Sequence, residues 1–553
     1  MELLNSLCSQ AVLPGDQMMV RGKIKIGGWP CLLRHSRDAE IVQGSVSHVE
    51  GAVVSDGRAY VVVVGAGPTG LYLAGDLAEA GVAVTVLERR SDKTSNLARA
   101  FAVHARTMES FDMRGLIDEL LSEAVCRVRR ITWFDAATGD FSRLATRYNW
   151  MTVTPQYNVE RILLDRARRL GVTIRYDTEV VDLRQDATGV EVDARSSDGT
   201  RSTYHAEYVV GCDGNRSAVR TLVDIPWDGQ ELLTSMILAD VRFAEPPPGE
   251  LAIWVRARTD RGFAVLVPYD DENWWRIVAW HRDHATTDVT PDLTTLADVV
   301  REAHGTDYGM YDPRWLSVYD ADERQARTYR AGRVFVAGDA GHMHSPAGGQ
   351  GMNVGLQDAE NLAVKLIAVR RGAPESILES YESERYPVGQ RVIQATGNLV
   401  RAAIGQPEER SAIRAEMQRP SVGDRIAEQL SGLPVRYPAP PGAHPAVGAK
   451  AEDVPLVKGT RLYEALRDRR HVLLMPTDAD EAPPLDGWHD RVQVVTRADA
   501  VSETEPSVLL IRPDGYVAGA WHTADAAHLA AVLPPVLTEQ CGPRTHEHDT
   551  VTG

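Results

Sequence analysis

Cysteine is scarce and scattered in this chain of 553 residues, which contains five in total. No two of them have the CxxC or CxxxxC spacing, so a disulfide framework, a thiolate metal site and catalysis by a paired redox disulfide are not expected. Unpaired cysteines are typical of proteins in a reducing compartment, and we therefore expect a cytoplasmic protein.

Long apolar runs and an excess of basic residues are also missing. No apolar stretch reaches the roughly 18 residues that a membrane span needs, and the opening MELLNSLCSQAVL lacks the basic residues of a signal peptide. The net charge is −17, which disfavours a nucleic-acid partner because binding phosphates needs a basic surface. These features predict a soluble protein with neither a membrane nor a nucleic-acid partner.

The length predicts two to four domains. Residues 1–58 show no sustained hydrophobic period and no usable motif. Two interpretations stay open for them: an extension without fixed structure, or residues upstream of a natural start at Met18 or Met19. We leave this segment out of the expected fold.

A β-loop-α-β unit begins at Tyr60. YVVVV (60–64) has the all-apolar, β-branched character of a strand buried on both faces, and VAVTVLE (82–88) is the next strand. Between them, GAGPTG is followed by LYLAGDLAEAG, which has a helical period and ends at a glycine. This order is the context in which a glycine-rich loop binds a dinucleotide.

The loop itself fits G-x-G-x-x-G through Gly65, Gly67 and Gly70, and acidic Glu88 ends the next strand. The first glycine permits the tight turn, the second lets a pyrophosphate approach the backbone, and the third lets helix and strand pack. The helix start at Pro68–Thr69 offers free N–H groups to the phosphates, and Glu88 can accept hydrogen bonds from an adenosine ribose. The motif alone does not distinguish FAD from NAD.

Two further motifs follow buried strands later in the chain: GCDGNRSAVR (211–220) and FVAGDAGHMHSPAGGQGMNVG (335–355). Each alone is compatible with an ordinary loop. An extended FAD needs more than one loop, because its isoalloxazine ring lies far from its adenosine. A helix starting near Gly351–Asn353 can direct N–H groups at the flavin ring, whose reduced form is anionic. No second strand-GxGxxG-helix unit is evident, so no separate nicotinamide domain is expected.

With ARAFAVHARTMESFDMRGL (98–116) and TPQYNVERILLDRARRLGV (154–172), these motifs resemble the FAD-dependent monooxygenases of the para-hydroxybenzoate hydroxylase type over about residues 60–397. The resemblance implies that Glu88 holds the adenosine ribose and that Asp339 binds a ribityl hydroxyl. It also implies a role for Asp213 in flavin and nicotinamide binding. The cofactor-binding residues predicted in this way are Gly65, Gly67, Pro68, Thr69, Gly70, Glu88, Arg89, Arg99, Arg106, Gln156, Asp213, Gly338, Asp339, Pro346, Gly349, Gly351, Met352 and Asn353.

Several of these residues have an implied position. Arg89 is expected near the adenine, Arg99 and Arg106 near the pyrophosphate or ribityl chain, and Gln156 on the ribityl side of the flavin. Pro346 is expected to border the place of oxygen transfer. His342, in the same loop, is more simply explained as a residue that gives the loop its shape.

The C-terminal part follows a linker rich in Pro, Gly and Ala (437–453). Its strands, its PDG hairpin turn and a final alanine-rich helix near 524–537 resemble the thioredoxin-like appendage of aromatic polyketide and phenol hydroxylases. It contains only Cys541, so we predict that it performs no redox chemistry and has a structural or assembly role.

We therefore expect an α/β protein with five segments: an N-terminal extension (1–58), a Rossmann-like, glutathione-reductase-like FAD-binding domain in two pieces (59–235 and 320–400), an inserted β-sheet-rich substrate domain (236–319, with part of 125–155), a helical connector (401–436) and a thioredoxin-like domain (437–553).

The implied reaction uses NAD(P)H and O2 to hydroxylate an aromatic polyketide or other polycyclic phenol through a C4a-hydroperoxyflavin. Baeyer–Villiger insertion, epoxidation, and an FAD-dependent reduction without oxygenation stay open as alternatives. No catalytic acid or base and no metal ligand can be named. Trp254 and Trp275 are in the strand region expected to cover the substrate. Two interpretations stay open for them: packing in the core, which is the first choice for any single tryptophan, and an aromatic wall for a flat polycyclic substrate. Whether the chain forms a homodimer stays open.

Overall fold

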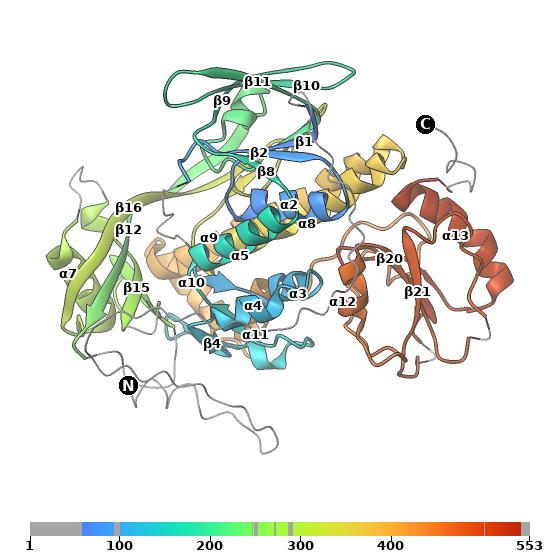
Figure 1. Ribbon diagram of the computed structural model, residues 1–553. Helices are drawn as coiled ribbons and strands as arrows, with labels where there is room; N and C mark the ends of the chain where they lie inside the picture. The colour runs from blue at the N-terminus through green and yellow to red at the C-terminus, as the bar shows by residue number, and fades with distance from the viewer. Residues whose placement is uncertain are drawn as a thin grey trace, which may run out of the picture. The chain divides into compact units, whose positions relative to one another are not determined.

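The computed structural model describes residues 58–92, 100–245, 247, 253–269, 273–285, 291–479, 481–502 and 504–543. Arg99 and the N-terminal segment therefore lie outside the described residues. Figure 1 shows mixed α/β architecture with separate sheets, which confirms the predicted fold class.

The first sheet carries the β-loop-α-β unit. Its strands follow the order β17-β18-β11-β1-β2-β8, with β10 and β9 attached to β11, and the five strands from β18 to β8 are parallel. The bounds are β1 (Arg58–Val64), β2 (Val84–Leu87), β8 (Thr173–Arg175), β9 (Glu179–Gln185), β10 (Val190–Arg195), β11 (Arg201–Gly211), β17 (Arg330–Ala331) and β18 (Val334–Val336).

Strand β1 is buried on both faces, as its all-apolar sequence predicts. Val61 and Val63 pack with the helices on one side, while Val62 and Val64 pack with β9 and β10 on the other. Each buried valine stabilises the fold by about 1.5–3 kcal/mol. The covering helices are α2 (Pro68–Glu79), α5 (Gln156–Arg169) and α8 (Gly351–Arg370), with α3 (Ala105–Asp112) and α4 (Ile117–Ser122) nearby (Figure 1). Helix α6 (Ala218–Leu222) packs with β9 on the other face.

The second sheet has the order β19-β16-β12-β15-β14-β13-β5-β6. Its strands are β5 (Arg130–Trp133), β6 (Ala137–Asp140), β12 (Trp227–Phe243), β13 (Trp254–Arg256), β14 (Gly262–Pro268), β15 (Trp274–His281), β16 (Met310–Ala326) and β19 (His342–Met343). Helix α7 (Leu293–His304) packs on one face. The other face packs with residues of α9 (Glu379–Ile404), α10 (Pro407–Met417) and α11 (Val422–Ser431). A small sheet of β3 (Ala102–Val103), β7 (Met151–Val153) and β4 (Cys126–Val128) adjoins this region.

The C-terminal domain contains a four-stranded sheet in the order β21-β20-β22-β23, in which β20 and β21 are parallel and the other pairs antiparallel. Its elements are α12 (Leu462–Ala465), β20 (His471–Met475), β21 (Val492–Thr496), β22 (Val508–Ile511), β23 (Val517–Trp521) and α13 (Ala526–Cys541). The predicted PDG hairpin turn joins β22 to β23.

Candidate functional site

The three strand-end motifs lie together at one edge of the first sheet. Strands β18, β11 and β1 are adjacent and parallel, so their carboxyl ends, and the loops that follow, meet at the same edge. The Cys212 N–H donates to the Val64 carbonyl at 2.8 Å, and the Ala337 N–H donates to the Gly211 carbonyl at 2.9 Å. Segments separated by more than a hundred residues of sequence thus form one site.

The glycines of the first loop meet different surroundings. Gly65 has φ +106°, and a Cβ there would lie 2.4 Å from the Cys212 carbonyl oxygen. A Cβ on Gly70 would lie 2.0 Å from the Gly65 carbonyl oxygen. Gly67 has φ −81°, and a Cβ there would meet nothing within 4 Å. The loop is therefore packed tightly on its protein side and open at Gly67.

Gly67 is also the residue that precedes helix α2. No side chain caps this helix, and Pro68 stands at its first positions, so the N–H groups of the first turn remain available to an anion. An open glycine beside an uncapped helix start fits the pyrophosphate of a dinucleotide.

Thr69 joins the first loop to the third. A Cβ on Gly338 would lie 2.7 Å from the Thr69 Oγ1, and a Cβ on Gly355 would lie 2.5 Å from the same atom. The Thr69 side chain therefore packs against the protein, and only its backbone can serve a ligand at this edge.

Glu88 is buried at the end of β2. Its carboxylate accepts hydrogen bonds from the Ala66 N–H at 2.7 Å and from the Arg90 side chain at 3.0 Å. Burial alone would raise the pKa of Glu88, but the hydrogen bonds from Arg90 and Ala66 outweigh it and lower the pKa. Glu88 is thus an ionised acceptor beside the glycine loop. Arg89, the next residue, is exposed.

Three other predicted residues use their side chains within the protein. Asp213 accepts from Ser217 Oγ at 2.5 Å and from the Val219 N–H at 3.1 Å at the start of α6, and burial raises its pKa. Gln156 accepts from the Ala100 N–H at 3.2 Å.

Asn353 is the third of these residues. It accepts from the His104 N–H at 2.9 Å and donates to the carbonyls of Ala102 (2.9 Å) and Gly349 (2.8 Å). These side chains give the loops their shape, which leaves the loop backbone to face a ligand.

Asp339 is exposed in the third loop, directly after buried Gly338. A Cβ on Gly351, the first residue of α8, would lie 3.9 Å from Asp339 Oδ1 and 3.8 Å from His344 Nε2. His344 Nδ1 is 2.8 Å from the Ser345 carbonyl and must carry the proton, so Nε2 is a buried acceptor without a partner among the described residues. A buried acceptor of this kind next to Asp339 fits a ligand rich in hydroxyl groups. The adjacent Met352 is buried in the core.

Arg106 does not lie where the resemblance implied. Its guanidinium donates to the Asp514 carbonyl at 2.5 Å and to Glu360 Oε2 at 3.3 Å, and it stacks on the Tyr516 ring. The side chain is 1% exposed, so no ligand can reach it. The prediction that Arg106 lies near the pyrophosphate or ribityl chain is therefore wrong. A buried guanidinium needs a buried anion as its partner, and Glu360 is that partner for Arg106.

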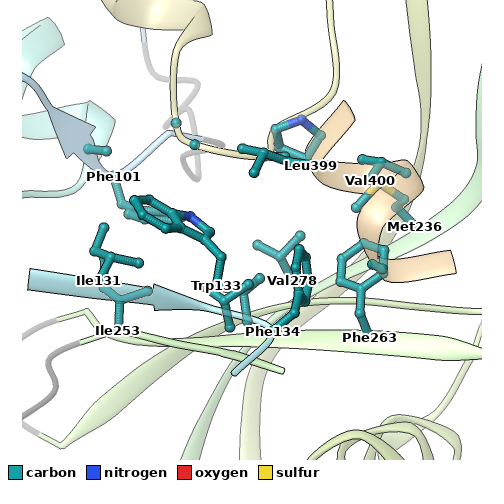
Figure 2. Close-up of a pocket in the computed structure, with 18 of the residues that line it drawn as sticks. Phe101, Ile131, Trp133, Phe134, Met236, Ile253, Phe263, Val278, Leu399 and Val400 are labelled. Carbon is teal, nitrogen blue, oxygen red and sulfur yellow. The ribbon is translucent and has the colours of Figure 1, made fainter. Parts of the chain in front are cut away.

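An apolar cavity lies between the second sheet and the third loop. Its empty space, with the open solvent at its mouth included, is about 720 Å³. Pro346, Ala347, Gly348 and Gly349 border it, and residues of α9 face the sheet across it, as Figure 2 shows for Leu399 and Val400. The labelled residues of its wall are Phe101, Ile131, Trp133, Phe134, Met236, Ile253, Phe263, Val278, Leu399 and Val400 (Figure 2). No titratable side chain is among the described residues that line it.

Trp254 and Trp275 do not line this cavity. Side chains alternate between the faces of a strand, so Val255 and Val278 face the cavity, while Trp254 and Trp275 pack on the opposite face beside α7. Their packing with the α7 side of the sheet agrees with the core interpretation, and they do not form an aromatic wall of this cavity.

Trp133 and Phe134 are two of the four aromatic residues in the described cavity wall that sequence reasoning missed. They end β5 and begin the turn to β6, and both are buried against the cavity. The alternation in RITW, which places Ile131 and Trp133 on one face, is the signal that could have identified them.

Two buried histidines beside the third loop make the stability of the protein sensitive to acid. Burial lowers the pKa of His104 to about 4, and burial together with His342 lowers the pKa of His344 to about 4. Between pH 6.5 and 4.5 both histidines become protonated in the unfolded chain but stay largely neutral in the folded protein. The free energy of unfolding therefore falls as the pH falls.

We expect His344 alone to contribute about 2–3 kcal/mol of this fall. Urea unfolding of the wild type and of His344→Gln over this pH window measures the difference. The variant should show the shallower dependence on pH, and equal slopes would contradict a neutral, buried His344. Carboxylates do not confuse the comparison, because both proteins contain the same ones and their contributions cancel in the difference between the two slopes.

The fold and the site define a flavoprotein: a Rossmann-type edge with a glycine loop that is open at Gly67, a third loop in which His344 Nε2 has no partner among the described residues, and an apolar cavity beside that loop. Residues 58–396 match the FAD binding domain family, and residues 444–543 match the aromatic-ring hydroxylase C-terminal family. The first match covers more than half of the chain, so the chain belongs to this FAD-binding family. It is an FAD-dependent monooxygenase, as the sequence predicted.

Individual relatives agree with this assignment. The 12-dehydrotetracycline 5-monooxygenase/anhydrotetracycline 6-monooxygenase of Streptomyces rimosus is 38% identical over 83% of this chain and 94% of its own length. A rifampicin monooxygenase of Streptomyces venezuelae is 34% identical over 86% of this chain and 98% of its own. The structure of the OxyS anhydrotetracycline hydroxylase from Streptomyces rimosus matches with a TM-score of 0.76, at 35% identity, over 88% of this chain and all of that one.

Among the described residues, none of the helices has the length and apolar character needed to cross a membrane.

Proposed function

We propose that the protein uses NAD(P)H and O2 to hydroxylate an aromatic, polycyclic substrate in natural-product tailoring. The observation that carries the proposal is the position of the apolar cavity, because Pro346–Gly349, which borders it, belongs to the same loop as Gly338 and Asp339 of the third FAD motif. An aromatic substrate is supported by relatives such as CabE, an aromatic hydroxylase from angucycline biosynthesis, which is 32% identical with a TM-score of 0.74.

The FAD would lie along the edge of the first sheet. The open Gly67 and the start of α2 would hold its pyrophosphate, with Gly65 and Gly70 giving the loop its packing, and Glu88 would accept from its adenosine ribose. Asp339 would accept from the ribityl chain. Bound FAD supplies the transfer of electrons from NAD(P)H and the activation of O2.

The ring end would lie nearer the cavity. The N–H groups at Gly351, Met352 and Asn353 open helix α8, whose positive end favours the negative charge of a reduced ring. Pro346 and Gly349 border the cavity and would flank the place where ring and substrate meet with backbone rather than with bulky side chains.

At the cavity, the side chains of the protein would position the substrate and exclude water. Aromatic and branched side chains fix a flat molecule by contact area, and they keep water from the reacting atoms. Since the described lining contains no acid or base, the electron-rich carbon must be activated by the substrate's own hydroxyl group.

Isotopically labelled O2 tests the proposal. The holoenzyme is incubated under labelled O2 with NADPH or NADH and with a panel of polycyclic and single-ring phenols. The masses of the products are then measured by mass spectrometry. We expect one labelled oxygen atom in a product of a polycyclic phenol, bound to a ring carbon. Label in a ring ester or an epoxide would redirect the proposal to insertion or epoxidation, and product formed without O2 would contradict oxygenation.

A further inference from the structure

Among the described residues, the C-terminal domain contributes none to the lining of the cavity or to the three loops. Its cysteine, Cys541, is buried in α13 with its Sγ 3.1 Å from the Leu537 carbonyl, and burial raises the pKa of the thiol to about 12. A thiol that stays protonated is a poor nucleophile. The domain therefore needs a different explanation.

Its hairpin turn reaches into the FAD-binding domain. Arg512, at the end of β22, donates to both carboxylate oxygens of Glu384 on α9, at 2.9 and 3.1 Å. Lys365 of α8 donates to the same carboxylate at 2.6 Å. Burial alone would raise the pKa of Glu384, and Arg512 and Lys365 outweigh it and hold the pKa far below its ordinary value. The turn is thus fixed to α9 by charges that are nearly inaccessible to water.

The next residue of α9, Arg385, contacts α8. Arg385 is fully buried and donates through Nε to Asp358 Oδ1 of α8 at 2.7 Å. It also contacts the Tyr437 hydroxyl at 3.4 Å, and the Tyr437 ring stacks at 4.0 Å on Tyr516 of the same hairpin turn. Two successive residues of one helix, Glu384 and Arg385, therefore hold the C-terminal turn and Asp358.

Asp358 in turn holds both ends of the Gly338–His342 segment of the third loop. Its Oδ2 accepts from the Gly338 N–H at 3.1 Å and lies 2.6 Å from His342 Nε2. Asp339 stands between these two attachment points. All the charged side chains of this relay are buried, and a buried charge that loses its partner is strongly destabilising, so the geometry tolerates little movement at any link.

We propose that the C-terminal domain is a positioning element for the flavin: its Arg512–Tyr516 turn sets the orientation of Glu384 and Arg385, and through Asp358 the placement of the Gly338–His342 loop that carries Asp339. The proposal concerns FAD binding and holds whichever aromatic substrate the enzyme takes.

Arg512→Lys tests the relay, with Arg469→Lys as its matched control. Arg469 is an equally buried arginine of the same domain, and it pairs with Asp76 of α2 at 2.8 Å, away from α9. We expect Arg512→Lys to raise the Kd for FAD by on the order of 5-fold or more and to shift the visible absorption of the bound flavin. Arg469→Lys should leave both unchanged, whatever it does to the melting temperature.

A double variant separates positioning from general loosening. If Arg512 acts through Asp358, then adding Arg512→Lys to Asp358→Asn should produce no further rise in the Kd for FAD. Additive effects, or equal effects of Arg512→Lys and Arg469→Lys on the Kd, would overturn the proposal. Should Arg512→Lys fail to fold, Tyr437→Phe replaces it under the same criteria, because it removes only the hydroxyl that contacts Arg385.

Discussion

Gly67→Ala is expected to yield a folded protein that no longer retains FAD. The backbone at Gly67 is extended with a negative φ, and an added Cβ meets no protein atom within 4 Å, so no clash destabilises the apoprotein. The methyl group would occupy the space in which a pyrophosphate approaches the loop. Displacing two charge-assisted hydrogen bonds, at about 1.5–3 kcal/mol each, would raise the Kd for FAD by about 100-fold or more.

The measurement is a titration of apoprotein with FAD, combined with the melting temperature of the apoprotein. Gly70→Ala is the contrasting variant. Its Cβ would lie 2.0 Å from the Gly65 carbonyl oxygen, a backbone atom that cannot move without distorting the loop. Gly70→Ala should therefore lower the melting temperature of the apoprotein, while Gly67→Ala should not. Normal FAD binding by Gly67→Ala would contradict the site assigned to the pyrophosphate.

Val278→Phe is expected to exclude large substrates while sparing flavin. Val278 faces the cavity from β15, and a phenyl ring there fills space that a polycyclic molecule needs. When a few carbon atoms of a substrate no longer fit their pocket, about 1–3 kcal/mol of binding free energy is lost. The KM for a polycyclic phenol should therefore rise by about 10- to 200-fold. The FAD content and the KM for a single-ring phenol should change little.

Trp275→Phe is the matched control for this experiment. It lies on the same strand, but its side chain packs beside α7 on the opposite face of the sheet. Steady-state NADPH oxidation measures KM for both variants across substrates of increasing ring number. If Trp275→Phe raised the KM for a polycyclic phenol more than Val278→Phe does, the substrate would bind on the α7 face of the sheet, and the cavity would not be the substrate site.

Local pattern accounts for the parts of the fold that sequence reasoning predicted. The run YVVVV has no polar face, which suits only a strand buried on both sides, and β1 lies in the centre of the first sheet. GxGxxG between a strand and a helix could be recognised because the turn, the helix start and the acidic residue after the next strand are all encoded within one short segment. The start of α8 at Gly351 was predictable for the same reason.

The candidate site was predictable in its motifs and less so in its side chains. The sequence indicated Asp339 and Glu88 as acceptors, and these roles remain proposals. It could not show that Asn353 and Asp213 use their side chains to shape loops, because their partners are contributed by other segments. Arg106 was placed by resemblance, and its partner Glu360 is 254 residues away in sequence.

The sequence by itself determined that the chain has a dinucleotide loop, three strand-end motifs in order and no paired cysteines, and through these the membership of an FAD monooxygenase family. Only the tertiary structure decided which face of the second sheet lines the cavity, and that the PDG turn is anchored through Arg512 and Glu384 to the helix behind the flavin loop. The physical reason is range: hydrophobic period and turn chemistry act over a few residues, whereas the burial of a face and the pairing of buried charges depend on segments that meet only in the folded chain.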